Sequence, residues 1–229
     1  MQVSCKKPGC FEDAGPLITT HRETASFHSI ELFDDVNLVL TQDTTESIKV
    51  IAAKNIEPNI SVQNKNGVLT IRNNTTCKWL RSPNEKSTVY LSIKTLDHIE
   101  YSGSGNVSST NTLRADKISF YSATGAGNID ISLEAKQVTA NLEYESADFI
   151  FRGRADVCYC YAGSRGTLNF KDFEVKYLVV AYAGVRDVTV NATERIEAII
   201  YHVGNVYYKG NPANIATKFY SSGRLYRTP

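Results

Sequence analysis

The chain has 229 residues, enough for one large domain or two small ones with a substantial hydrophobic core. Its 25 basic and 24 acidic residues nearly cancel, which removes the usual electrostatic argument for a nucleic-acid partner. No uninterrupted apolar stretch reaches the length of about 18 residues that a membrane-spanning helix needs. The 13 tyrosines and 9 phenylalanines, together with frequent Val, Ile and Thr, favour pleated β-structure.

The first residues bear on location. Met1-Gln-Val-Ser4-Cys5 looks like the end of a bacterial lipoprotein signal, in which a small residue precedes the cysteine that becomes lipidated. Gln2 stands where leucine is usual, and the apolar part of such a signal is absent, so either that part has been removed or Met1 is the true start. We expect export and lipidation of Cys5. The alternative is an ordinary disordered N-terminus with a stray thiol.

The other four cysteines fall into two settings. Cys10 and Cys77 lie in turn-like surroundings, where a disulfide would pin the N-terminal arm to the body of the domain. Such a bridge closes a long loop and stabilises a protein by roughly 2 to 4 kcal/mol. Cys158 and Cys160 are one residue apart in a strand-like run, so their side chains share a face and are poorly placed to bond each other. We interpret this second pair as small apolar wall residues, with a metal or redox site as the alternative.

The N-terminal part divides into a tether and a set of paired strands. Residues 1–25 lack periodicity and contain the Pro and Gly residues typical of a tether. From residue 26 to residue 98, short alternating runs predict a strand meander with hairpins. The clearest hairpin signal is Asn66-Gly67, which stands between two such runs. A polar loop that contains Trp79 interrupts the alternation.

From residue 99 onward the chain repeats about every 20 residues. Each unit contains a tyrosine, several small or polar residues, an Asn, Asp or Gly, and then an apolar strand-like run. No segment shows a helical period, so the sequence predicts an all-β protein with one domain over residues 26–229, in which the meander leads into a right-handed parallel β-helix. An apolar column runs in step with these units, at spacings of 18 to 21 residues: Ile118, Val138, Val157, Leu178 and Ile196.

Several segments carry a family resemblance. The run Tyr101-Ser-Gly-Ser-Gly-Asn-Val, followed by Gly125-Ala-Gly-Asn-Ile, resembles the signature of the head GIN domain family, which comprises exported bacterial proteins described as auto-transporter adhesins. The resemblance covers about residues 26 to 226. It implies a β-solenoid, a location in the cell envelope, and an adhesion or binding role without known catalytic residues. Further matching segments are Phe27–Leu32, Asn66–Ile71, Cys77–Trp79, Gly204–Tyr208 and Gly210–Pro212.

The Asn/Asp/Gly positions of the repeats form a turn column with two possible interpretations. Their polar groups could line a sugar or cation site along one edge. We interpret them as turn residues, which tolerate left-handed backbone conformations and bond to adjacent rungs. The turn column is Asn106, Asn128, Asp148, Gly166, Asp187 and Asn205.

The tyrosines of the repeats also have two interpretations, an aromatic platform for sugar rings or packing within the walls. Strand parity, counted from the apolar column, puts Tyr121 and Tyr201 outside but Tyr144, Tyr161 and Tyr182 inside. The candidate ligand-binding residues are therefore Tyr121, Tyr201 and Trp79.

Catalytic and metal sites have weaker support. A polysaccharide lyase or hydrolase on a β-helix needs closely placed acids, and glycoside hydrolysis requires two carboxyl groups about 5 to 9.5 Å apart. The four histidines fall in separate segments and form no metal pattern. Alternating Arg and Asp residues are more typical of solvated ion pairs. The candidate acids are Asp130, Asp148, Asp156, Asp172 and Asp187, with Arg152, Arg154, Arg165 and Arg186 nearby.

We therefore predict a noncatalytic envelope protein, an adhesin that uses no cofactor and binds carbohydrate or another surface component. Its expected location is the periplasm, outer membrane or cell surface of a Gram-negative bacterium, with membrane attachment only through a lipid on Cys5. The first alternative is a polysaccharide lyase or hydrolase on the same scaffold. The second is a structural component of the envelope.

Overall fold

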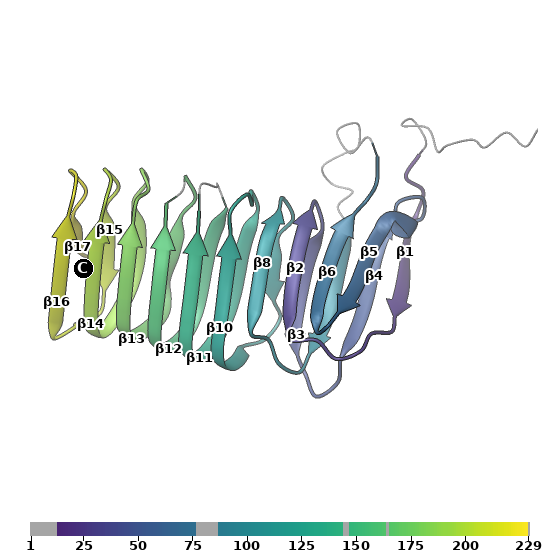
Figure 1. Ribbon diagram of the computed structural model, residues 1–229, viewed down its shortest axis with the longest axis horizontal. Coiled ribbons are helices and arrows are strands. Elements are labelled where there is room, and N and C mark those ends of the chain that lie inside the picture. Colours follow the sequence, from purple (N-terminus) through teal and green to yellow (C-terminus); the bar gives the residue numbers. More distant parts are fainter. Residues whose placement is uncertain (1–12, 77–86, 144–146, 164, 229) are drawn as a thin grey trace, which may run out of the picture.

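The computed structural model describes residues 13–76, 87–143, 147–163 and 165–228. They form an elongated β-solenoid in which successive strands stack side by side along one axis (Figure 1). Within these residues the only helical element is the short 3-10 helix η1 (Glu57–Asn59). The strands are β1 (Leu17–Arg22), β2 (Ser29–Asp34), β3 (Asn37–Gln42), β4 (Ser47–Ala53), β5 (Ile60–Lys65), β6 (Val68–Asn73), β7 (Thr88–Ile93), β8 (His98–Gly103), β9 (Val107–Ser109), β10 (Leu113–Ser122), β11 (Asn128–Leu142), β12 (Asp148–Ala162), β13 (Leu168–Tyr182), β14 (Val188–Ile200), β15 (Val206–Lys209), β16 (Asn214–Phe219) and β17 (Leu225–Arg227).

Two walls of hydrogen-bonded strands enclose the core. The first wall runs in the order β5, β6, β2, β8, β10, β11, β12, β13, β14, β16. The second wall runs in the order β1, β4, β7, β3, β9, β11, β12, β13, β14, β15, β17. Strands β11 to β14 are long because each begins in the second wall, bends at a corner and continues in the first. The expected β-solenoid with rungs of about 20 residues is confirmed.

The hydrophobic core fills the space between the two walls along the whole solenoid. Along β11 to β14, buried side chains alternate with partly exposed ones, as the period of two in a pleated strand requires. Phe151 stacks on Phe170 with ring centroids 4.7 Å apart, and Phe120 from the first wall lies 4.7 Å from Phe151. Each such fully buried side chain stabilises the fold by about 1.5 to 3 kcal/mol relative to an exposed one.

The N-terminal part combines antiparallel pairs with one inserted parallel rung. Strands β5 and β6 form the expected hairpin, and its turn residues Asn66 and Gly67 have φ angles of 53° and 82°. Strands β2 and β3, however, do not pair with each other or with a sequence neighbour. β2 lies in parallel between β6 and β8, and β3 lies in parallel between β7 and β9. The alternation in the sequence indicates which face of a strand is buried, but not which strand lies beside it.

Regular structure begins earlier than the expected domain boundary at residue 26. Leu17–Arg22 is strand β1, which pairs antiparallel with β4 over its full length. Ala14, before this strand, is buried. The sequence analysis did not predict β1 because this edge strand lacks a clear alternation of apolar and polar residues. Its side chains are exposed or half-buried, so they need not be apolar.

Four of the five residues predicted to form the apolar column lie in one row of the first wall. In the register Ile118 pairs with Val138, and Leu178 pairs with Ile196, but the residue between Val138 and Leu178 is Cys158. The assignment of Val157 was therefore wrong by one residue, which turns a side chain to the opposite face of a strand. The same shift overturns the expected inward position of Tyr161, which is partly exposed.

Candidate ligand-binding surfaces

The turn column joins successive rungs by side-chain hydrogen bonds. The Asn106 backbone N–H donates to Asn37 Oδ1 at 2.9 Å, and the Asn128 N–H donates to Asn106 Oδ1 at 3.2 Å. Near the other end, the Asn205 N–H donates to Asp187 Oδ1 at 2.9 Å. In each of these contacts, a short polar side chain accepts a backbone N–H from the turn that follows it along the axis. The same contact joins Asp148 to the Thr167 N–H at 2.8 Å and Asn205 to the Arg224 N–H at 3.0 Å.

The backbone of the turn column differs from the expectation. None of its residues has a positive φ; among the described non-glycine residues only Asp34 and Asn66 do. The expected left-handed conformations were therefore wrong, because these positions need a side-chain acceptor and not an unusual backbone. Gly166 lacks such an acceptor and is required for a different reason: a Cβ there would lie 1.9 Å from the Ala147 carbonyl oxygen.

Two tyrosines of the repeats point into the core and fix the turns. The Tyr101 hydroxyl donates to the Gly105 carbonyl at 2.6 Å and accepts from the Gly127 N–H at 2.8 Å. Tyr182 makes the corresponding bond to the Arg186 carbonyl. Burial raises the pKa of Tyr182 to about 12, so this hydroxyl remains a donor at physiological pH. Tyr182 therefore has the inward position that strand parity predicts, and it belongs to the turn structure rather than to a ligand surface.

Two other tyrosines are only partly exposed. Tyr121 and Tyr161 occupy the same outward row of the first wall, with Asn141 between them. Tyr121 points outward as predicted, but it is half-buried and its hydroxyl lies 3.4 Å from Glu143 Oε2. Tyr144 lies outside the described residues. Neither Tyr121 nor Tyr161 offers an open ring face comparable with those at the C-terminal end.

An exposed pair of stacked aromatic rings, Tyr201 and Tyr220, lies at the C-terminal end. Their ring centroids are 5.0 Å apart and their planes differ by 8°. Tyr201 is 43% exposed and Tyr220 is 56% exposed. Lys218 Nζ lies 4.9 Å from the centroid of the Tyr220 ring, and the nearby hydroxyl of Tyr220 raises the pKa of this lysine. This aromatic pair is an open, preorganised platform with a cation beside it.

Sequence reasoning selected Tyr201 as a candidate ligand-binding residue but did not select Tyr220. The two residues are separated by a full rung in the chain, and the stacking follows from the parallel pairing of β14 with β16 immediately before them. The signal that could have identified Tyr220 is the Lys218-Phe219-Tyr220 run, in which aromatic and basic residues gather at the last rung.

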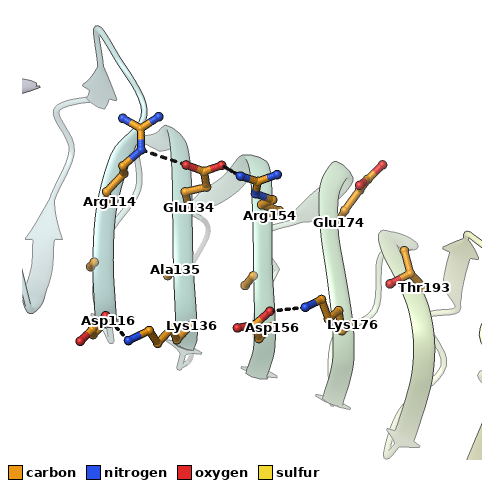
Figure 2. A pocket seen from close by; sticks show the side chains of 12 residues that line it. Arg114, Asp116, Glu134, Ala135, Lys136, Arg154, Asp156, Glu174, Lys176 and Thr193 are labelled. Atoms are coloured by element: carbon orange, nitrogen blue, oxygen red, sulfur yellow. Dashed lines mark hydrogen bonds and ion pairs between the residues drawn. The ribbon is translucent and has the colours of Figure 1, made fainter.

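A groove of about 620 Å³ runs along the corner of the solenoid, where β10 to β14 bend between the walls. Its floor includes Ala115, Ala135 and Ala155, which lie in register on three successive strands. Figure 2 shows a row of charged side chains on each side of these alanines. The small floor residues leave the hollow, and the long charged residues form its rims.

The charges on the rims alternate in sign from rung to rung. On one rim Glu134 lies between Arg114, at 2.9 Å, and Arg154 (Figure 2). On the other rim Lys136 pairs with Asp116 at 2.8 Å, and Lys176 pairs with Asp156 at 2.7 Å. The ion-paired aspartates raise the pKa of both lysines. Sequence reasoning missed these rims, although their residues recur every 20 positions with alternating sign: Arg114, Glu134, Arg154 and Glu174, then Asp116, Lys136, Asp156 and Lys176.

The ion pairs on the rims indicate that the groove has a structural role rather than a ligand-binding one. Its rims carry equal numbers of positive and negative charges, so it has no net attraction for a charged polymer. Exposed ion pairs of this kind contribute at most about 1 kcal/mol each. The carboxylates of Asp116, Glu134 and Asp156 lie beside Lys or Arg, whereas a catalytic acid needs an environment that keeps it protonated. The rims therefore tie adjacent rungs together.

The candidate acids for catalysis are divided among separate contacts. Asp130 pairs with Arg152, Asp156 pairs with Lys176, and Asp172 lies 4.0 Å from Lys171. Asp148 and Asp187 belong to the turn contacts given above. In the part of the chain that the structure describes, no three His, Cys, Asp or Glu side chains converge as metal ligands. Each of the five candidate acids thus has its own polar partner among the described residues.

The cysteines divide between the core and the segments that are not described. Cys158 and Cys160 are free and buried in the first wall, which confirms them as apolar wall residues. Burial raises the pKa of the Cys158 thiol to about 12 and raises the pKa of the Cys160 thiol well above its usual value. The lipidation candidate Cys5, the disulfide candidates Cys10 and Cys77, and the ligand candidate Trp79 all lie outside the described residues.

Solved structures with the same fold come from species of Bacteroides and Parabacteroides. An adhesin, described as putative, from Bacteroides fragilis NCTC 9343 is 26% identical with a TM-score of 0.84, and the match covers 93% of this chain and 97% of that one. A second such adhesin, from Parabacteroides distasonis ATCC 8503, is 20% identical with a TM-score of 0.72, and the match covers 93% and 98% of the two chains. A protein from the same organism, described as "Putative lipid binding protein", shares the fold at 16% identity and a TM-score of 0.73, with coverage of 94% and 98%.

A search of curated proteins found no match to this chain. Among the described residues, no helix is long and apolar enough to cross a membrane.

The solved structures agree with a match to a protein family. The family described as "Putative auto-transporter adhesin, head GIN domain" matches residues 26–212, which is most of the solenoid. The chain therefore belongs to the head GIN domain family of adhesin-like proteins.

Proposed function

We propose that this chain is a noncatalytic adhesin that binds carbohydrate through the stacked pair Tyr201 and Tyr220. The single observation that carries the proposal is the exposure of two parallel tyrosine rings at one end of a rigid solenoid. Sugar rings present apolar C–H faces that pack on an aromatic ring, while their hydroxyls hydrogen-bond to polar neighbours. The tyrosine hydroxyls and Lys218 provide such neighbours here.

Preorganisation supports this surface over the other tyrosines. The rings of Tyr201 and Tyr220 are already parallel, so binding requires little ordering of the side chains. Tyr121 and Tyr161 are half-buried, and Tyr101 and Tyr182 are enclosed in the core. Tyr159 and Tyr177 are exposed, but neither is in a stacked pair among the described aromatic contacts. The stacked pair therefore offers a ligand two exposed rings that are already aligned.

The C-terminal position of the stacked pair is compatible with attachment of the chain to the membrane through its N-terminus. Strand β1 and strand β16 lie at opposite ends of the solenoid (Figure 1). We propose that the chain is exported and held to the envelope by a lipid on Cys5. Such an anchor would leave Tyr201 and Tyr220 directed away from the membrane.

A glycan array probed with the soluble domain tests the proposed function. The decisive variants are Tyr201→Ala and Tyr220→Ala, with Tyr159→Ala as a matched control because Tyr159 is 47% exposed on a different part of the solenoid. We expect binding that survives the control substitution and falls about two- to tenfold with either decisive one, since an aromatic contact contributes about 0.5 to 1.5 kcal/mol beyond its buried area.

Two results would contradict the proposal. Equal binding by all three variants would show that the stacked pair is not the platform. Cleavage of a bound glycan, detected by chromatography of the products, would favour the polysaccharide lyase or hydrolase alternative. Binding with no release of products supports the noncatalytic adhesin.

A further inference from the structure

The last rung that the structure describes has an exposed inward face. All six residues of β16 are exposed, although β16 continues the first wall in register with the buried strand β14. Ile215 follows Ile196 in the same inward row, and Phe219 follows Ile200. Ile215 is 50% exposed and Phe219 is 40% exposed, whereas Ile196 and Ile200 are fully buried. Apolar side chains in core positions thus meet solvent at this end.

The N-terminal end of the solenoid is closed in a different way. On the edge strand β1, two of the three inward residues, Thr20 and Arg22, are polar, and Arg22 pairs with Glu57 at 2.8 Å. Thr20 donates to the same carboxylate at 2.7 Å, and Arg22 also donates to the Ile60 carbonyl. Inward-pointing charged residues are a common device that prevents an edge from pairing with another chain. At the C-terminal end, the inward residues of β16 are Ile215, Thr217 and Phe219, none of which is charged. The Arg224 guanidinium lies over the Phe219 ring, 5.1 Å from its centroid, but it comes from outside the strand. The two ends are therefore chemically distinct.

The edge of β16 also offers backbone hydrogen-bonding groups. In a parallel ladder, the N–H and C=O groups of successive residues point alternately to the two sides of the strand. The Tyr220 N–H donates to the Ile200 carbonyl at 2.8 Å, so this residue and every second one before it face β14. The N–H groups of Ile215, Thr217 and Phe219 therefore face the open side. Among the described strands, β16 pairs only with β14.

Charge selects the kind of strand that fits this edge. Residues 209–229 contain Lys209, Lys218, Arg224 and Arg227 but no Asp or Glu. Lys218 lies in an outward row of the first wall, between the inward residues Thr217 and Phe219. A second copy of this edge would bring lysine close to lysine across the two-fold axis, which is unfavourable. An incoming strand with acidic outward side chains would face Lys218 favourably.

We propose that β16 is a docking edge for an extended acidic segment of a partner protein, which adds a strand to the first wall. The partner's inward side chains are apolar and cover Ile215 and Phe219. Its outward side chains are acidic and lie beside Lys218. The backbone of β16 supplies the main-chain hydrogen bonds, and the alternation of apolar and acidic residues supplies the specificity, as in other cases of β-strand addition.

Two synthetic peptides of equal length test this inference, one alternating Val and Glu and the other alternating Val and Lys. Binding to the soluble domain is measured by fluorescence anisotropy of the labelled peptides. We expect the acidic peptide to bind and the basic peptide to bind at least about tenfold more weakly, because opposite charges across strands attract and like charges repel. Raising the salt concentration should narrow this difference.

Two variants separate a strand edge from nonspecific attraction. Thr217→Pro removes an N–H that faces the open side, which an edge strand tolerates, and should abolish binding of the acidic peptide while circular dichroism remains unchanged. Lys218→Glu should reverse the preference, so that the basic peptide binds better than the acidic one. This second variant tests the proposal even if the proline substitution disturbs folding.

Several outcomes would overturn the docking edge. One is equal binding of both peptides, or of neither, by the unmodified domain. Another is retention of the acidic peptide by a folded Thr217→Pro variant. A third is sedimentation of the domain as a dimer that Thr217→Pro converts to a monomer, which would identify a second copy as the occupant. The peptide assay is independent of the glycan array, so the failure of one proposal is distinguishable from the failure of the other.

Discussion

Asp187 on one rung accepts the backbone N–H of Asn205 on the next rung, and its Oδ1 also accepts from the Asn205 side-chain amide at 3.0 Å. Asn205 in turn accepts the Arg224 N–H. These contacts show why short polar residues recur at the turns: each satisfies a backbone donor that the bend of the following rung leaves without a strand partner. These turn contacts thus join neighbouring rungs at the C-terminal end of the scaffold.

Replacing Asp187 with alanine should destabilise the C-terminal rungs. The substitution removes the acceptor for the Asn205 N–H, a loss of about 1 to 2 kcal/mol for a hydrogen bond to a charged group. Asp187→Asn is the matched control, because it keeps an acceptor oxygen and should cost less than half as much. Urea unfolding followed by circular dichroism measures both. Equal destabilisation by the two substitutions would contradict a role for the acceptor.

Substitution of Gly166 by alanine should be more damaging than the same change at Gly163. At Gly166 the new Cβ would lie 1.9 Å from the Ala147 carbonyl oxygen, so the backbone itself must move. At Gly163 the nearest atom is the Tyr161 hydroxyl at 2.8 Å, which belongs to a side chain that can rotate. We expect a loss of about 3 kcal/mol for Gly166→Ala, at the upper end of overpacking costs, and about 1 kcal/mol or less for Gly163→Ala. Thermal unfolding of both variants measures the difference.

The N-terminal edge should be sensitive to acid through Glu57. Hydrogen bonds from Arg22 and then Thr20 lower the pKa of Glu57 from its ordinary value of 4.5. A lowered folded-state pKa contributes stability that is present above pH 4.5 and is lost as the pH falls through the folded-state value. The variant Glu57→Gln should be less stable at pH 7 and should lose less stability between pH 4.5 and pH 3. Urea unfolding across this range tests the slope, and identical slopes would contradict the assignment.

The buried thiols should be inert in the folded protein and should make it sensitive to base. Burial raises the pKa of Cys158 from 9.0 to about 12, so its thiol stays neutral in the native state. A raised pKa contributes stability that is full below pH 9.0 and is lost as the pH rises towards 12. We expect no alkylation of Cys158 or Cys160 by iodoacetamide at pH 8 without denaturant, as measured by mass spectrometry. Rapid alkylation of the native protein would contradict their enclosure, and Cys158→Ala should reduce the loss of stability above pH 9.

Lipid attachment at Cys5 can be tested in a Gram-negative host. The chain expressed behind a bacterial lipoprotein signal that ends before Cys5 should incorporate radiolabelled palmitate and fractionate with membranes. Cys5→Ser should abolish the label and release the protein, because no thiol then remains at the proposed attachment position. Cys10→Ser is the matched control, and it should keep both properties. Labelling that persists in the Cys5→Ser variant would contradict the proposal.

The sequence by itself determined the class of fold and the length of the repeat. A parallel ladder places the same position of each rung in the same environment, so turn residues, apolar residues and tyrosines recur about every 20 positions. The Asn66-Gly67 hairpin was also readable, because its turn requires two residues that tolerate positive φ. These features depend on local chemistry, which each segment carries with it.

Only the tertiary structure shows which strands are neighbours and which side chains meet across rungs. Asn37 bonds to Asn106 across 69 residues because β2 and β3 insert between strands that come later in the chain, and no local pattern encodes that pairing. A shift of one residue, from Val157 to Cys158, decided that Tyr161 faces outward. The stacking of Tyr201 on Tyr220 required the register of the last two rungs. The physical reason is the same in each case: alternation determines which side chains share a face of one strand, whereas contact between strands depends on a register set by the packing of the whole core.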